Sequence, residues 1–175
     1  MAIIIKTEAV VIKKVSLLNR DYSVFFFTRE KGKLMAVAKG AKKLTSRRMT
    51  HLQTGNLLEV SLHSYKSHYY IRDSKLVTLL SAVKENLPKS RYLYFFLYLI
   101  DRLLPQEQQE IGVYQLMKGF FSGLHRAKAF DQYQMAQYFS RLLVLLGYGN
   151  DGMTFDEAVA VTENLIGEKL PREFV

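Results

Sequence analysis

The stretch YSVFFFTREKGKLMAVAKG, residues 22–40, decides the fold class of this 175-residue chain. Its first part, Tyr22–Thr28, is mostly aromatic or β-branched, a composition typical of β-strands. A polar turn follows, in which Gly32 can adopt a positive φ. Lys33–Gly40 then alternates in side-chain character, which predicts a strand with one buried face. The stretch therefore predicts two strands joined by a tight turn.

Three further strands are predicted around this pair, from segments rich in β-branched and aromatic residues: Thr7–Val15, Asn56–His63 and Tyr69–Leu80. A longer polar and basic connection, reaching to about Thr54, separates the third strand from the fourth. Five short strands with this spacing are typical of an OB-type barrel. An open five-stranded sheet is the alternative.

Beyond Leu80 the apolar residues recur at helical spacing. Three amphipathic stripes follow one another, in residues 92–103, 113–124 and 135–146, and Thr154 and Glu157 have the spacing of a capping box before a last helix. The longest uncharged apolar run, Tyr92–Ile100, is far shorter than the about 20 residues of a membrane span, and is interpreted as a buried helix face. The sequence predicts an α+β fold: a five-stranded OB-type β-barrel in residues 1–80, which would bind nucleic acid, and a helical domain in residues 81–175.

The net charge of +9 is concentrated in one half of the chain. Residues 1–80 hold 15 lysines and arginines against 5 acidic residues, whereas residues 81–175 hold 10 against 11. Such an asymmetry indicates a polyanionic partner for the basic half.

Few residues support catalysis. The chain has no cysteine, which excludes disulfides, thiolate zinc sites and cysteine nucleophiles and is consistent with a cytosolic protein. Neither GxxxxGK[ST] nor GxGxxG occurs. A Mg²⁺-dependent nuclease needs several converging carboxylates, and those of the basic half are scattered along it. His63 and His68 have only Asp73 nearby and are interpreted as surface histidines. We expect no enzyme activity, no bound metal and no cofactor.

The most specific feature is the segment Lys39–Arg48, KGAKKLTSRR, which holds five cations and no acidic residue. Lysine and arginine side chains on a loop with glycine, serine and threonine can follow a phosphate backbone. Nearby aromatic residues could stack on bases, although each could equally belong to the core; the candidates are Tyr22, Tyr65, Tyr69 and Tyr70, around Lys66 and Arg72.

Three segments at this spacing resemble the N-terminal signature of the bacterial RecO family of recombination-mediator DNA repair proteins: Thr7–Val11 (TEAVV), Phe27–Leu34 (FTREKGKL) and Ala36–Lys43 (AVAKGAKK), with Ser46 and Arg47 soon after. Leu143–Tyr148 (LVLLGY) and Leu165–Leu170 (LIGEKL) resemble later parts of the same family. The resemblance departs at two points. Many relatives carry a four-cysteine zinc module after the LLGY-like segment, and that module is missing here; the Lys-Ser pair expected beside Arg172 is also absent.

The resemblance implies an N-terminal OB domain, a helical domain and no catalysis. It implies binding of single- and double-stranded DNA, annealing of complementary strands, and loading of a recombinase together with two partners, the RecR protein and the C-terminal tail of the single-stranded-DNA-binding protein. It also implies a cytoplasmic protein that associates with the nucleoid during repair. Carried over by position, the DNA-binding residues would be Lys33, Lys39, Lys42, Lys43, Arg47 and Arg48.

Two other functions suit the same residues. A barrel with a basic loop could bind structured RNA. Alternatively, the helical half could be a protein-interaction adaptor whose basic half only keeps it soluble.

Overall fold

The computed structural model describes residues 3–18, 21–40, 48–78, 80–171 and 173. The chain divides into two compact units. The first contains Met1–Leu79 together with Leu104–Ile111, and the second contains Leu80–Leu103 together with Gly112–Val175.

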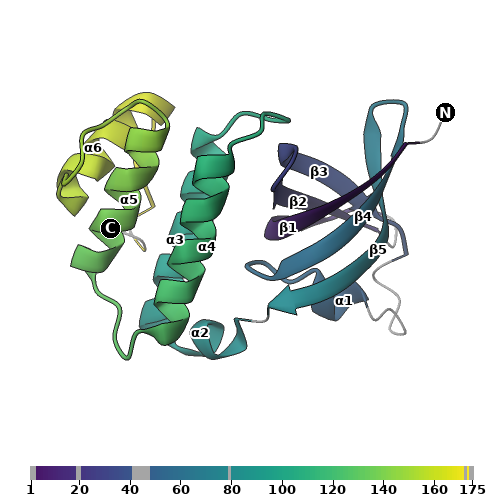
Figure 1. The fold of residues 1–175 in the computed structure, drawn as a ribbon, viewed down its shortest axis with the longest axis horizontal. Helices are drawn as coiled ribbons and strands as arrows, with labels where there is room; N and C mark the ends of the chain where they lie inside the picture. Colours follow the sequence, from purple (N-terminus) through teal and green to yellow (C-terminus); the bar gives the residue numbers. More distant parts are fainter. Residues whose placement is uncertain (1–2, 19–20, 41–47, 79, 172, 174–175) are drawn as a thin grey trace. The chain divides into compact units, whose positions relative to one another are not determined.

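The first unit is a closed barrel in which the strands follow the order β1-β2-β3-β5-β4 (Figure 1). Its strands are β1 (Ile3–Ser16), β2 (Tyr22–Thr28), β3 (Gly32–Ala38), β4 (Leu57–Tyr65) and β5 (His68–Thr78). The long β1 pairs with both β2 and β4, and a short parallel pairing of β3 with β5 closes the barrel. The predicted OB-type barrel is confirmed, and the open sheet is excluded.

Alternate residues of the strands fill the barrel interior, as the pleat of a strand requires. The buried cluster includes Val11, Val24, Phe26, Leu34, Leu58 and Leu62. Leu52 belongs to this cluster and is only 1% exposed. It directly follows α1 (Arg48–His51), so this one-turn helix covers part of the barrel core. The sequence pattern does not predict α1, because four residues are too few to show helical periodicity.

The chain returns to the barrel in residues 104–111. The backbone N–H of Glu107 donates to the carbonyl of Lys33 at 2.8 Å, and Gln106 forms a parallel bridge with Lys33. The Tyr69 hydroxyl donates to the Glu107 carboxylate at 3.5 Å. This segment therefore extends the sheet beside the start of β3.

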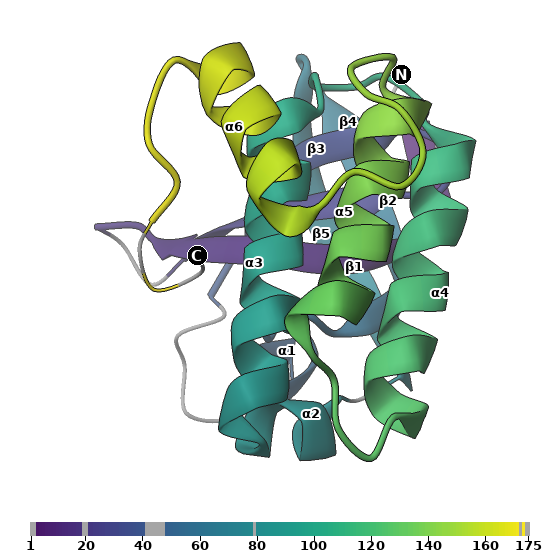
Figure 2. The same ribbon diagram turned by 90° about the vertical axis from the view of Figure 1, so that its left-hand side faces the viewer.

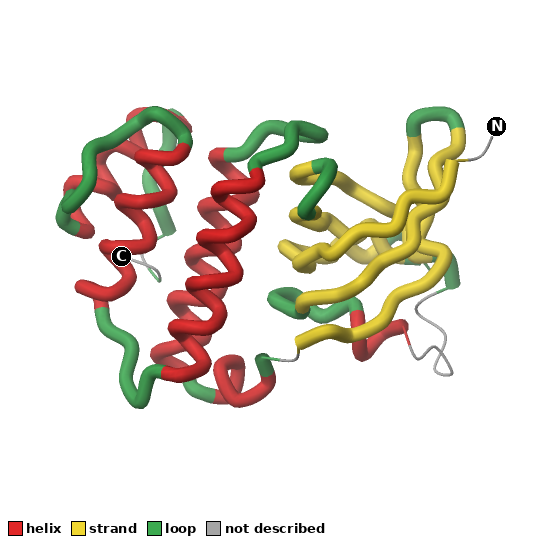
Figure 3. The backbone as a smooth tube through the Cα atoms, viewed as in Figure 1, coloured by secondary structure: helices red, strands yellow, loops and turns green. Residues whose placement is uncertain are grey.

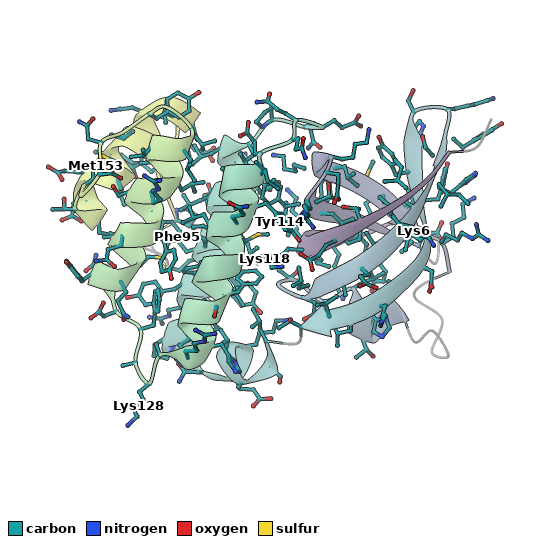
Figure 4. All side chains as sticks on the ribbon, viewed as in Figure 1. Lys6, Phe95, Tyr114, Lys118, Lys128 and Met153 are labelled. Atoms are coloured by element: carbon teal, nitrogen blue, oxygen red, sulfur yellow. The ribbon has the colours of Figure 1, made fainter. Side chains whose placement is uncertain are left out.

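The second unit consists of α2 (Ser81–Glu85), α3 (Leu87–Leu103), α4 (Ile111–Arg126), α5 (Gln132–Leu145) and α6 (Phe155–Ile166). Within it, α3 and α4 form one layer and α5 and α6 a second (Figures 1 and 2). Phe95 of α3 lies in the interior, with ring centroids 5.4 Å from Phe139 and 5.7 Å from Phe155 (Figure 4). The aromatic stripes of the sequence are thus the core of this unit.

Two capping boxes begin the helices of the second layer. The predicted box at Thr154 and Glu157 is present, and Asp131 with Gln134 forms another at the start of α5. No helix in the described part of the chain is both long enough and apolar enough to cross a membrane.

Candidate nucleic-acid interface

Most of the acidic residues in residues 1–80 gather at one place on the barrel. Four of the five acidic residues in residues 1–80 line a single hollow of about 510 Å³: Glu8, Glu30, Glu59 and Asp73. Lys6, Arg29 and Lys75 line the same hollow, and Lys75 lies 4.0 Å from the Glu59 carboxylate. The fifth, Asp21, accepts a hydrogen bond from the Gly40 N–H at 2.7 Å. The hollow has no excess of positive charge, so a polyanion is favoured elsewhere on the barrel.

A strip of aromatic and basic residues lies outside that hollow, on the outer face of β4 and β5. His63 pairs across the strands with Tyr70, and Tyr65 pairs with His68. Because side chains alternate along a strand, these four residues share one face. We call them, with Lys39 and Lys66, the aromatic-basic strip.

Each tyrosine of the strip lies under a lysine. The ammonium of Lys39 is 4.7 Å from the ring centroid of Tyr70, and that of Lys66 is 5.5 Å from the centroid of Tyr65. Ring faces attract cations in this arrangement. The two remaining stacking candidates, Tyr22 and Tyr69, pack against the barrel core. Tyr22 also has a lysine over its ring, with the Lys14 ammonium 5.4 Å from the ring centroid.

The predicted DNA-binding residues fall in three groups. Lys39 is exposed at the end of β3, whereas Lys33 is only 6% exposed, which leaves little access for a phosphate. Arg48 is the first residue of α1. Lys42, Lys43 and Arg47 lie outside the described residues.

Hydrogen bonds hold the backbone on both sides of the basic segment. Before it, Asp21 binds the Gly40 N–H. After it, the fully buried Asn56 donates from its side-chain amide to the carbonyls of Thr50 and His51, at 3.2 and 2.9 Å. His51 Nδ1 lies 3.0 Å from the carbonyl oxygen of Ser74 on β5. These contacts fix the positions at which the basic segment leaves the barrel and rejoins it.

The anchoring roles of Asp21 and Asn56 are not predictable from the sequence pattern. Asp21 and Asn56 are of the types that bind backbone groups near turns, and that was the only available signal. Their partners are 19 and 5 to 6 residues away, so the pairing depends on the fold.

Among the described residues, no group of three or more histidine, aspartate or glutamate side chains is placed to hold a metal ion. In the helical unit, a hollow of about 650 Å³ beside α5 includes Tyr133, Arg141 and Asp151 in its lining. Arg141 lies 3.4 Å from Asp151, so these two charges offset each other, and the hollow lacks the charge bias of the strip.

Residues 1–80 match the family model described as "Recombination protein O N terminal". These are the residues that form the barrel strands and α1. The chain is similar to the RecO family of proteins. Similar proteins named "DNA repair protein RecO" come from Caldanaerobacter subterraneus, with 28% identity over 144 residues, and from Clostridium novyi, with 32% identity over 151 residues. A third, from Clostridium perfringens, is 30% identical over 161 residues.

These matches cover 82%, 85% and 89% of this chain, and 58%, 58% and 62% of the respective relatives. The chain therefore spans less than two thirds of the length of these RecO proteins.

Proposed function

We propose that this chain is a non-catalytic recombination mediator. It binds single- and double-stranded DNA through the barrel, anneals complementary strands and helps to load a recombinase. The observation that carries the proposal is the charge distribution of residues 1–80: four of their five acidic residues line one hollow, while the residues of the aromatic-basic strip lie outside it. Residues 39–48 add five cations and no acidic residue. Cations gathered away from carboxylates suit a phosphate backbone.

The proposed mechanism is charge neutralisation. Two complementary strands repel each other through their phosphates, and lysine and arginine side chains that contact both strands reduce this repulsion. Base pairing then supplies the sequence specificity. Within the proposal, Lys39, Lys42, Lys43, Arg47 and Arg48 bind phosphates.

Charge reversal tests this function. We expect Lys42→Glu combined with Lys43→Glu to abolish the annealing of two complementary oligonucleotides, because each change replaces an attraction to phosphate with a repulsion. Arg126→Glu combined with Lys128→Glu is the matched control, since both residues are exposed in the helical unit and the change in net charge is the same (Figure 4 shows Lys128). Normal annealing by the Lys42 and Lys43 variant, in a protein that remains folded, would contradict the proposal.

The partners are proposed on the family resemblance. They are the RecR protein and the C-terminal tail of the single-stranded-DNA-binding protein, the tail docking on the helical unit. Gel filtration of the chain with the single-stranded-DNA-binding protein, with and without DNA, tests the second partner. Co-elution without DNA supports direct docking, and co-elution that requires DNA contradicts it. If the chain prefers folded RNA to single-stranded DNA in competition, the RNA-binding alternative replaces DNA binding.

A further inference from the structure

The turn between β4 and β5 has a backbone conformation that its residues rarely adopt. Tyr65 and His68 are the last pair of the ladder, and the two residues between them have positive φ, 46° for Lys66 and 61° for Ser67. Two-residue hairpin turns of this kind favour asparagine and glycine, which tolerate positive φ. Here a lysine and a serine occupy these positions. Unfavourable backbone conformations that persist are concentrated at functional sites.

The tip of this hairpin presents an aromatic ring and positive charge. The Tyr65 side chain is 53% exposed, and the Lys66 ammonium lies over its ring. The ring of His68 is held by a contact of 2.7 Å between Nδ1 and the carbonyl oxygen of Lys66. Residues 64–70, SYKSHYY, contain no acidic residue. The exposed Tyr65 ring is therefore available to a ligand, and no carboxylate within residues 64–70 would repel a phosphate there.

The tip is continuous with the rest of the aromatic-basic strip. His68 and Tyr70 are two residues apart on β5, which places their side chains on the same face, about 7 Å apart along the strand. Tyr70 in turn lies under Lys39, where the basic segment begins. Figure 3 shows the β4–β5 turn at one end of the barrel. The strip thus runs from Lys39 and Tyr70 past His68 to Tyr65 and Lys66, with a lysine over a tyrosine ring at each end.

We propose that this strip is a binding site for unpaired bases, in which Tyr65 and Tyr70 stack on bases while Lys39 and Lys66 bind the neighbouring phosphates. The ligand class is single-stranded DNA, and the inference rests on the DNA-binding function proposed above. A base inside a duplex has its faces covered by its neighbours, so an exposed ring can stack only on a base that is unpaired and unstacked. Loops at the equivalent place in OB folds contact oligonucleotides. Because its ring stacks only on unpaired bases, the tip makes the chain prefer single-stranded DNA. Contacts between lysines and phosphates alone would not give this preference.

The test compares a single-stranded oligonucleotide with an abasic strand of equal length, which keeps the phosphates and lacks the bases. We expect Tyr65→Ala to weaken binding of the normal strand by at least about fivefold, the lower end of what one stacked base contributes. It should leave the affinity for the abasic strand unchanged. Tyr65→Phe should restore binding, because phenylalanine keeps the ring face. Tyr133→Ala is the matched control, since Tyr133 is a 73% exposed tyrosine of the helical unit.

The outcomes separate the inference from the function on which it rests. Unchanged affinity of Tyr65→Ala for the normal strand, or an equal loss on both strands, overturns the stacking site while leaving DNA binding intact. Failure of the unsubstituted chain to bind either strand overturns the proposed function itself. Loss on the normal strand alone, with rescue by Tyr65→Phe, supports both.

Discussion

At the scale of single residues, Gly32 lies where strand β3 meets residues 104–111, the segment that returns to the barrel. It has φ +66°, which favours glycine, and it begins β3 immediately after the polar turn. A Cβ atom at this position would lie 1.7 Å from the carbonyl oxygen of Gln108, in the segment that returns to the barrel. Two independent constraints therefore exclude a side chain at this position.

We expect Gly32→Ala to lower the free energy of unfolding by more than about 2 kcal/mol, because a left-handed backbone alone costs about 1 to 2 kcal/mol and the clash with Gln108 adds to this. Chemical denaturation measures the loss. The matched control is Gly147→Ala, since Gly147 has φ +81° but no atom within 4 Å of an added Cβ. Equal losses for the two variants would show that the close approach of residues 104–111 does not constrain Gly32.

At the scale of elements, the Glu163 carboxylate stabilises the C-terminal end of α6. Glu163 accepts hydrogen bonds from the Lys169 ammonium at 2.6 Å and from the Leu170 N–H at 2.9 Å. The Lys169 hydrogen bond is the main cause that lowers the pKa of Glu163 below its usual 4.5, and the Leu170 N–H adds to it. Because the folded-state pKa is the lower one, the stabilisation is complete above the unfolded value and is lost as the pH falls through the folded value.

The helical unit should therefore lose stability as the pH falls below about 4.5, the ordinary pKa of the group. In Glu163→Gln the carboxylate is absent at every pH, so the variant should be less stable than the unsubstituted chain near neutral pH. The difference should disappear in acid. Thermal unfolding followed by far-ultraviolet circular dichroism across this range measures it. A difference that is constant with pH would contradict the role of the Glu163 charge.

The sequence predicted the longer elements well, because their signals are local. Tyr22–Thr28 is strand β2 to the residue, and the capping box at Thr154 and Glu157 begins α6. Alternating or helical periodicity over seven or more residues determines which face is buried. The boundaries of the other strands shifted by one to four residues, since pairing with neighbouring strands extends or shortens a strand. Ile3–Ser16 is the clearest case, because β1 pairs with two strands.

Features that depend on distant pairing were not predictable in this way. The four residues of α1 carry no periodic signal, and the contact of His51 with Ser74 joins residues 23 positions apart. The burial of Lys33 was not predictable either, because a lysine in an alternating strand is usually exposed. The sequence predicts part of the aromatic-basic strip, because Tyr65 and Tyr70 are two of its four candidate stacking tyrosines. Only the register of the strands shows that Tyr65 and Tyr70 lie on the outer face while Tyr22 and Tyr69 pack against the core.

At the scale of the whole molecule, charge is divided between the two halves of the chain and again within the barrel. Residues 1–80 carry 15 basic and 5 acidic residues, against 10 and 11 in residues 81–175. Within residues 1–80, four of the five carboxylates line one hollow. A polyanion therefore has one favoured region to bind, and the strength of that binding should depend steeply on salt.

The most direct test of DNA binding is the salt dependence of the affinity for a labelled single-stranded oligonucleotide, followed by fluorescence anisotropy. If about five cations of residues 39–48 bind phosphates, the slope of log affinity against log salt is about −3.5. The affinity then falls about a hundredfold between roughly 50 and 200 mM salt. A slope near zero, or no binding even at low salt, would contradict the proposed DNA-binding function.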